Sequence, residues 1–335
     1  MQIAFFRRQR LDVRNGVANR PRFQAGDRVV VRSPEEILAT LDGDGTLARF
    51  PFMPEMLDSC GKVFQVERRV EKICAPDLPL RRFADDDVVV LEGVRCDGSA
   101  HDGCKDGCKV LWKEAWLRPF DPAIPTTPIS PAAIEQLRAR LKVKSDERHY
   151  FCQSTERLRA TLPFAGRQKV WMARIAIREI RNGDLPAGKV FRLFAVWFWQ
   201  RMLRAAGCDE WLRGRDQRTP TESLNLQPGE LVRVKSRAEI AQTLDRKIAN
   251  RGMGFCYEMT RCCGHEAEVR YRVDRIIDEK TGTMRELSNT VTLRSIGGAR
   301  ALEDECSCYG EPGDCPRAGL MYWREIWLER VKASA

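Results

Sequence analysis

The chain repeats itself, and this internal duplication limits its possible folds more than any other feature. Gly26 aligns with Gly229, and from Gly26 to Ile73 the residues at 18 of 48 positions recur 203 places later without a gap. Unrelated segments do not keep register over such a length, so the two stretches are copies of one unit. The copies diverge and then meet again, where WKEAWL at 112–117 corresponds to WREIWL at 323–328. We therefore predict two modules, at about 22–120 and 225–332.

Each copy shows the pattern of short strands and compact turns. A Gly-Asp or Gly-Glu turn precedes a β-branched run at 28–32 and its counterpart at 231–235. Ser33 followed by proline and by a glutamate three places later predicts a capped helix over 34–41. Further strands are expected near 63–73, 87–94 and 110–118. Such a module favours a small barrel, similar in its opening turn to SH3-like modules.

The segment between the copies differs in composition and in periodicity. Apolar residues at helical spacing predict helices at 131–142, 153–161, 167–181 and 187–206. The fold class is therefore α+β, with two small β-rich modules flanking a helical middle domain. The predicted organisation is an N-terminal extension (1–21), the first module (22–120), a Pro-rich linker (121–130), a basic helical domain (131–222) and the second module (225–332).

Thirteen cysteines are many for a chain that shows no secretory signal. The most apolar stretch, 190–203, carries Arg192 and Arg201 and is too short to span a bilayer. We therefore expect a cytoplasmic protein with no membrane partner. Because thiols stay reduced in the cytoplasm and the number of cysteines is odd, clustered cysteines are better interpreted as metal ligands than as disulfides.

In the first copy four cysteines form a candidate zinc site. Cys96, Cys104 and Cys108 lie in a glycine-rich loop between two predicted strands, and Cys60 would supply the fourth ligand from a distant turn. Four thiolates suit a tetrahedral Zn²⁺ ion. His101 is an alternative to Cys96.

The second copy repeats this set with different spacing. Cys263 is the counterpart of Cys60, and Cys306, Cys308 and Cys315 precede the second tryptophan segment. Because four thiolates leave no coordination position for water, the predicted ions are structural, about two per chain. Other candidates for ligands of the second ion are Cys256, Cys262 and His265.

Positive charge gathers in the middle of the chain. Residues 131–220 contain 19 Lys and Arg against 9 Asp and Glu, a difference of +10, which equals the net charge of the whole chain. Arg174, Arg178 and Arg181 lie near one another on a predicted helix. A cluster of this kind favours a nucleic-acid partner bound through its phosphates, and the alternative is a scaffold for an acidic protein.

An enzymatic function is the third hypothesis. Cys152 lies three residues from His149, so a Cys–His nucleophile pair is conceivable. Glu114 and Glu325, each between two tryptophans, could be functional carboxylates, although such a position more often faces solvent. The sequence shows no phosphate loop, dinucleotide fingerprint or serine elbow, and we assign no catalytic residue.

Two motifs carry a resemblance to a family of uncharacterised bacterial proteins. The first is DGCKDGC at 102–108 followed by WKEAWL, and the second is the aromatic-Cys-Gln-x-Thr-Glu stretch from Tyr150 to Glu156. The chain resembles this family over most of its length. The resemblance implies a bacterial origin and a duplicated cysteine-rich module, and it implies no activity.

Overall fold

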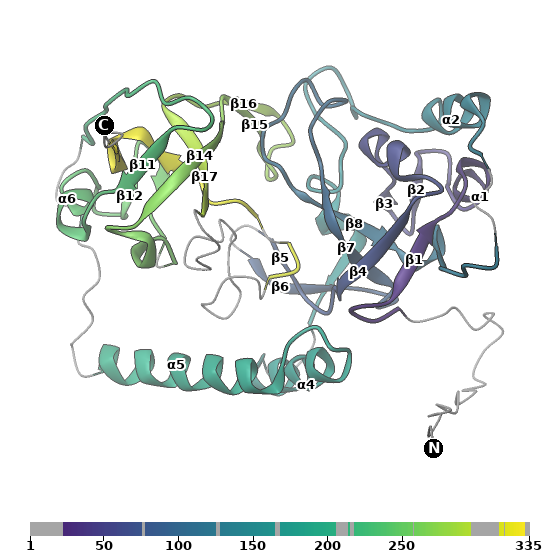
Figure 1. The fold of residues 1–335 in the computed structure, drawn as a ribbon, viewed down its shortest axis with the longest axis horizontal. Helices are drawn as coiled ribbons and strands as arrows, with labels where there is room; N and C mark the ends of the chain where they lie inside the picture. The colour runs from purple at the N-terminus through teal and green to yellow at the C-terminus, as the bar shows by residue number, and fades with distance from the viewer. Residues whose placement is uncertain are drawn as a thin grey trace.

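The computed structural model describes residues 23–331, apart from 76–77, 125–127, 165–167, 206–213, 215–217, 257, 296–314 and 318. It contains both helices and antiparallel sheets, so the α+β class is confirmed. Figure 1 shows two sheet-based halves side by side, with two long helices running along one side of the molecule.

The first copy is built on a five-stranded antiparallel sheet with the order β8-β7-β4-β1-β9. Its strands are β1 (Arg28–Val31), β4 (Val63–Arg69), β7 (Val88–Arg95), β8 (Lys109–Lys113) and β9 (Leu117–Pro119). The strand predicted at 110–118 is divided by a 3₁₀ turn, η2 (Glu114–Trp116), and its last part pairs with β1.

The second copy has the same strand order, β18-β17-β14-β11-β19. Its strands are β11 (Leu231–Val234), β14 (Glu266–Arg272), β17 (Thr290–Ser295), β18 (Trp323–Arg324) and β19 (Leu328–Arg330), with the turn η5 (Glu325–Trp327) before the last. Identical topology in the two halves agrees with the duplication read from the sequence.

Smaller elements complete each copy. Those in the first are α1 (Pro34–Leu38), β2 (Thr46–Leu47), β3 (Phe50–Pro51), η1 (Pro54–Ser59), β5 (Ile73–Ala75) and β6 (Leu78–Phe83). Those in the second are α6 (Arg237–Ala241), β12 (Ala249–Asn250), β13 (Met253–Gly254), η3 (Glu258–Cys262), β15 (Arg275–Ile277) and β16 (Met284–Glu286). Strands β15 and β16 form a hairpin.

The short helix α1 begins as predicted. The Ser33 side chain accepts a hydrogen bond from the Glu36 amide, and the Glu36 carboxylate accepts one from the Ser33 amide. Ser236 and Glu239 make the same reciprocal pair at α6. Each of these capping boxes satisfies amides that the first helical turn would leave without partners. This explains why so short a helix forms in both copies.

The tryptophans that end each copy are core residues. Trp116 and Trp327 are fully buried, and their indole Nε1 atoms donate to Thr40 and Thr243 at 3.1 and 3.0 Å. Glu114 and Glu325, the candidate functional carboxylates, are buried beside them and are paired with arginines of β4 and β14. These four positions therefore hold the fold together rather than facing solvent.

The middle of the chain contains α2 (Pro131–Arg138), α3 (Arg157–Ala160), β10 (Thr161–Pro163), α4 (Gln168–Arg181) and α5 (Ala187–Ala205). Strand β10 adds to β6 and β5 of the first copy. No helix in the described part of the chain combines the length and apolar character needed to cross a bilayer.

Helix α4 is tied to the first copy by buried charge. Lys72, which is fully buried, pairs with Glu179, and Arg178 Nε lies 2.8 Å from the Glu71 carboxylate. The Asp184 carboxylate, just after the helix, accepts a hydrogen bond of 2.8 Å from the Arg69 amide. Partners on both sides of the junction offset the cost of removing these charges from water.

Candidate metal centre and adjoining groove

Four cysteines from two segments line a small cavity at the end of the β7–β8 hairpin. Its volume is about 30 Å³. Three of the cysteines belong to the hairpin and the fourth precedes α3; they are Cys96, Cys104, Cys108 and Cys152. A negative charge on the Cys152 sulfur would be felt at each of the other three. As the side chains stand in the described residues, no group of three His, Cys, Asp or Glu is arranged to hold a metal ion.

The hairpin loop reaches this arrangement through a glycine. Gly98 has φ +69°, and a Cβ at this position would lie 2.0 Å from the Cys104 carbonyl oxygen. Its own carbonyl accepts the amides of His101 and Gly103 at 3.0 and 3.1 Å. The loop therefore closes on itself, and only glycine permits this approach.

The second segment is held against the hairpin by an amide side chain. Gln153 Oε1 accepts the Leu111 amide at 2.9 Å, and its Nε2 donates to the Leu111 carbonyl at 2.8 Å. Gln153 thus occupies both backbone groups of one β8 residue, as a neighbouring strand would. This contact positions Cys152 opposite the hairpin cysteines.

Backbone amides point at several of the sulfur atoms. Burial is the largest influence on these thiols and raises their pKa, to about 11 for Cys152. Hydrogen bonds from the backbone oppose it: the Gly98 amide to Cys96, the Asp106 amide to Cys104, and the Ser154 and Thr155 amides to Cys152. The Ile277 amide of β15 adds a contact to Cys104 at 3.4 Å. Donors aimed at sulfur stabilise the thiolate form that binds metal.

His101 lies beside these cysteines, but both of its ring nitrogens are engaged. Nδ1 is 2.6 Å from Glu55 Oε1, and Nε2 is 3.2 Å from the Phe151 carbonyl oxygen. Both partners accept, so the ring satisfies both only when doubly protonated. Burial is the largest single influence and lowers the pKa of His101. The hydrogen bond to Glu55, the charge of that carboxylate and the Phe151 carbonyl together outweigh it, so the net shift is upward. In this arrangement the ring has no lone pair for a metal ion, so His101 supports the loop.

Cys60, the predicted fourth ligand of the first site, lies elsewhere. It follows η1, packs in the hydrophobic core of the first copy and is not among the residues that line the cavity. Burial raises the pKa of its thiol to about 12. The structure thus brings together three of the four predicted cysteines, with Cys152 in the place expected for Cys60.

The cysteines of the second copy are dispersed over the described residues. Cys263 is half-buried at the edge of the second core, Cys262 is buried, and Cys256 and His265 are exposed. Cys315 is buried against Cys74 of the first copy, and the hydrogen bond between the two thiols, followed by burial, raises the pKa of Cys74. The remaining two predicted ligands, Cys306 and Cys308, lie outside the described residues.

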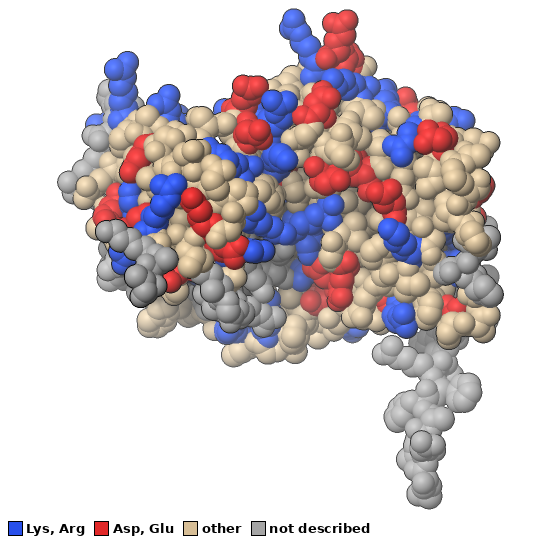
Figure 2. Space-filling model, turned by 45° about the horizontal axis from the view of Figure 1, so that its top comes forward, with Lys and Arg blue, Asp and Glu red and all other residues tan. Residues whose placement is uncertain are grey.

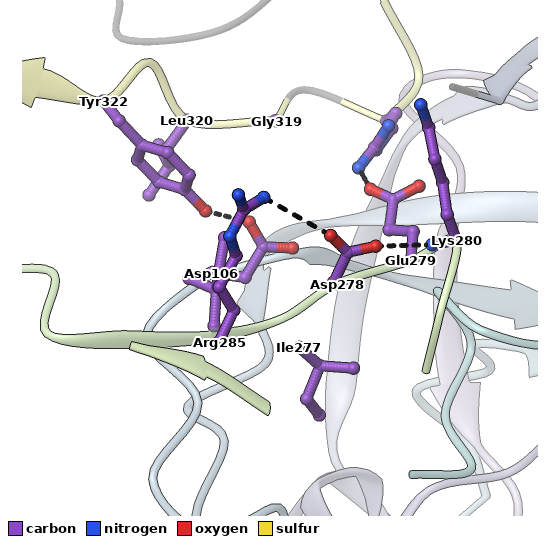
Figure 3. A pocket seen from close by; sticks show the side chains of 11 residues that line it. Asp106, Ile277, Asp278, Glu279, Lys280, Arg285, Gly319, Leu320 and Tyr322 are labelled. Carbon is purple, nitrogen blue, oxygen red and sulfur yellow. Dashed lines mark hydrogen bonds and ion pairs between the residues drawn. The ribbon is translucent and has the colours of Figure 1, made fainter. Parts of the chain in front are cut away.

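A groove of about 400 Å³ adjoins the cysteine cavity where the two copies meet. Its lining, shown in Figure 3, comes from the loop of the β7–β8 hairpin, the β15–β16 hairpin and the segment before β18. Asp106 and Ile277 line both spaces, so they form the wall between them. Tyr322 donates to Asp106, and Arg317 pairs with Glu279. Positive and negative groups are matched here, so the groove has no excess of one charge.

The geometry does not activate Cys152 as a nucleophile. Its thiol is buried in the cavity, and burial raises its pKa to about 11. The His149 ring is half-exposed, with Nδ1 2.8 Å from Asp146 Oδ1. A reactive cysteine needs an accessible thiolate with a lowered pKa. The Cys–His pair therefore has little support in this structure.

The three predicted nucleic-acid contacts have different surroundings. Arg174 and Arg181 are exposed on α4. Arg178 is engaged by Glu71 at 2.8 Å and by Asp86 at 3.0 Å, so its charge is offset within the chain. On the face of the molecule in Figure 2, Lys and Arg are interspersed with Asp and Glu, with no large field of one sign.

Comparisons with known proteins do not identify a relative. No family model matches the chain, and neither the curated proteins nor the solved structures contain a detectable match.

Proposed function

We propose that this chain is a zinc-stabilised binding protein of the adaptor type, in which a metal centre fixes the wall of a groove between two duplicated modules. The single observation that carries the proposal is the convergence of Cys96, Cys104, Cys108 and Cys152 on one cavity. Four thiols meeting in a buried space suit Zn²⁺, because thiolates are its preferred structural ligands.

The amide donors around the cavity support this assignment over a set of inert buried thiols. A neutral thiol gains little from N–H groups aimed at its sulfur, whereas a metal-bound thiolate gains much more. The cysteine side chains would turn inward to coordinate the ion. A second ion, held by cysteines of the second copy, remains part of the proposal because that copy carries a cysteine set of its own.

A link between metal and groove gives the centre a role beyond stability. The Ile277 amide donates to Cys104, and the Lys105 amide donates to the Arg275 carbonyl at 2.9 Å. The hairpin that carries the cysteines is therefore bonded to β15, which lines the groove. Because the charges in the groove are matched, it suits a polar segment of a partner protein rather than a polyanion.

The test separates the structural ligand set from the one predicted by sequence. We expect elemental analysis of wild-type protein to find about two zinc ions, Cys152→Ala to lose one of them, and Cys60→Ala to keep both. Cys60 is the matched control because it is also buried. Loss of zinc from the Cys60 variant alone would restore the ligand set predicted from sequence. Wild-type protein without zinc would overturn the proposal.

A chelator experiment covers the case in which a variant does not fold. Removing zinc from wild-type protein should speed hydrogen exchange at the Ile277 amide, because its acceptor is a proposed ligand. Exchange at the Val232 amide, in the core of the second sheet, should change much less. Equal changes at both amides would mean that the metal does not act through the groove wall.

A further inference from the structure

Helix α5 carries a continuous exposed apolar stripe. The exposed fractions are 77% for Phe191, 47% for Phe194, 58% for Phe198 and 54% for Met202. These positions follow the spacing i, i+3, i+7, i+11 and so lie on one face of the helix. Trp199, 65% exposed, lies beside this stripe. Isolated exposed apolar residues are ordinary, whereas a row of large ones on one element marks a contact surface.

Helix α4 adds basic and aliphatic residues in alternation. Val170, Arg174, Ile177 and Arg181 also follow the spacing i, i+4, i+7, i+11, and all four are exposed. The two helices contact each other and lie along the lower side of the molecule in Figure 1. Together they form what we call the helical face, defined by the exposed residues of α4 and α5.

The helical face lacks exposed acidic residues. Residues 168–205 contain eight Lys and Arg against two acids. Both acids, Glu179 and Asp184, are buried and engaged with the first copy, as described above. The charge available to a partner is therefore positive, in contrast to the mixed charges of the surface in Figure 2.

We propose that the helical face binds the surface of an anionic lipid bilayer. Aromatic and aliphatic side chains on one face of a helix, with basic groups around them, are the composition of helices that lie in the interface plane. The phenylalanines would enter the boundary between headgroups and acyl chains, and the basic groups would meet lipid phosphates. This proposal differs from the expectation of no membrane partner, which considered only spanning segments, and it does not depend on the proposed zinc centre.

Several features favour lipid over the nucleic-acid partner predicted from the sequence. Bases offer flat surfaces for stacking, which would engage Trp199 or a phenylalanine. Stacking makes no use of the exposed non-aromatic apolar side chains Val170 and Ile177 on α4 and Met202 on α5. Arg178, one of the three predicted phosphate contacts, already faces two carboxylates.

Sedimentation with vesicles tests the proposal on the full-length chain. We expect binding to vesicles of phosphatidylcholine and phosphatidylglycerol, weakened by salt, and little binding to phosphatidylcholine alone. The double variant Phe194→Ser/Phe198→Ser should bind at least tenfold more weakly, and Arg174→Gln/Arg181→Gln should lose most of the salt dependence. Leu231→Ser is the matched control, since Leu231 is an exposed apolar residue of the second copy, and it should bind like wild type.

Three outcomes would overturn the proposal. The first is that the wild-type protein binds neither kind of vesicle. The second is a wild-type oligomer that becomes a monomer in the Phe194→Ser/Phe198→Ser variant, which would mean that a second copy of the chain covers the stripe. The third is salt-sensitive binding to DNA or RNA that the same variant abolishes while vesicle binding persists, which would assign the helical face to nucleic acid.

Discussion

The two copies share a frame but differ in what they attach to it. Lys72 of the first copy is buried against α4, whereas its counterpart Arg275 in the second copy is half-buried and offers its carbonyl to Lys105 of the first hairpin. The same position of the repeat thus contacts helix α4 in the first copy and a loop of the first copy in the second. Duplication preserved the sheet, and the edges of the sheet diverged to make the junctions.

The cysteines show the same division. The Cys315 thiol of the second copy meets Cys74 of the first, and the hairpin cysteines of the first copy meet Cys152 from the middle of the chain. In both cases a cysteine of the first copy meets a cysteine that lies outside that copy. Cys60 and Cys263, which the alignment of the copies singles out, lie in or at the edge of the two hydrophobic cores. Identity between copies therefore marks the shared frame, whereas contacts between segments depend on residues that the copies do not share.

The largest difference between the copies is expected at the buried glutamates. Glu325 accepts the amides of Leu224, Asn225 and Leu226 at 2.6, 2.9 and 3.1 Å and pairs with Arg272. Within the described part of the chain, which begins at residue 23, Glu114 accepts the amide of Phe23 and pairs with Arg69. Removing one partner of a buried pair costs about 3–5 kcal/mol. Both members of the Arg69–Glu114 pair are buried, whereas about a third of the Arg272 side chain (32%) is exposed. Glu114→Ala should therefore destabilise the first copy by that amount, and Glu325→Ala should cost the second copy less.

Hydrogen exchange resolved along the chain, measured with increasing urea, would give the two free energies of opening separately. The isosteric variants Glu325→Gln and Glu114→Gln are the controls, since they keep an acceptor oxygen and lose the charge. Equal losses for both alanine variants would show that the burial of the remaining arginine does not set the cost.

The frame itself was predictable from the sequence because its signals are local. Ser33 and Glu36 form the predicted capping box, and the β1 strand and helices α4 and α5 lie within a few residues of their expected bounds. The strand expected at 110–118 is broken at Glu114, because this side chain turns inward to Arg69. That pair joins residues 45 positions apart, and no local pattern reports it.

The candidate site was predicted only in part for the same reason. The glycine-rich loop predicted three of the four cysteines. The position of Cys152 opposite them depends on the hydrogen bonds that Gln153 makes with the backbone of Leu111, and no local pattern reports these. The available signal was the stretch from Tyr150 to Glu156, where Gln153 and Glu156 stand among apolar and small residues. Both are buried, and buried polar groups need fixed partners, so such a stretch indicates a docking segment.

A smaller effect should distinguish the copies by pH. Burial raises the pKa of Asp184 to about 6, and one of its oxygens, Oδ2, has no hydrogen-bond partner among the described residues. Because the folded-state pKa exceeds the unfolded value, the stability that this group contributes is full below about pH 4 and is lost as pH rises through 6. The loss should be about 3 kcal/mol, confined to the first copy and α4.

Urea unfolding at intervals from pH 4 to 7 would measure this effect. The variant Asp184→Asn keeps an acceptor for the Arg69 amide and cannot ionise, so its advantage over wild type should grow with pH across that window. A constant difference at every pH would mean that Asp184 does not titrate in this range.

The smallest expected effect is the one that the copies should share. The hydrogen bonds from Trp116 to Thr40 and from Trp327 to Thr243 are nearly equal in length. Thr40→Val and Thr243→Val should each cost about 1 kcal/mol, since each leaves a buried indole N–H unpaired. Chemical denaturation of each variant, compared with Thr221→Val at an exposed position, would check the equality. Unequal costs would show that the two cores have also diverged.

The pairing of the last strand with the first in each copy bears on how such a chain could arise. Val29 faces Pro119 across β1 and β9, and Val232 faces Arg330 across β11 and β19, so the chain enters and leaves each unit at neighbouring points. A unit with adjacent ends can be copied in tandem, or accept new sequence at its ends, without any strand having to thread past another. About a hundred residues separate the copies here, and they lie at a junction where added sequence need not disturb either sheet.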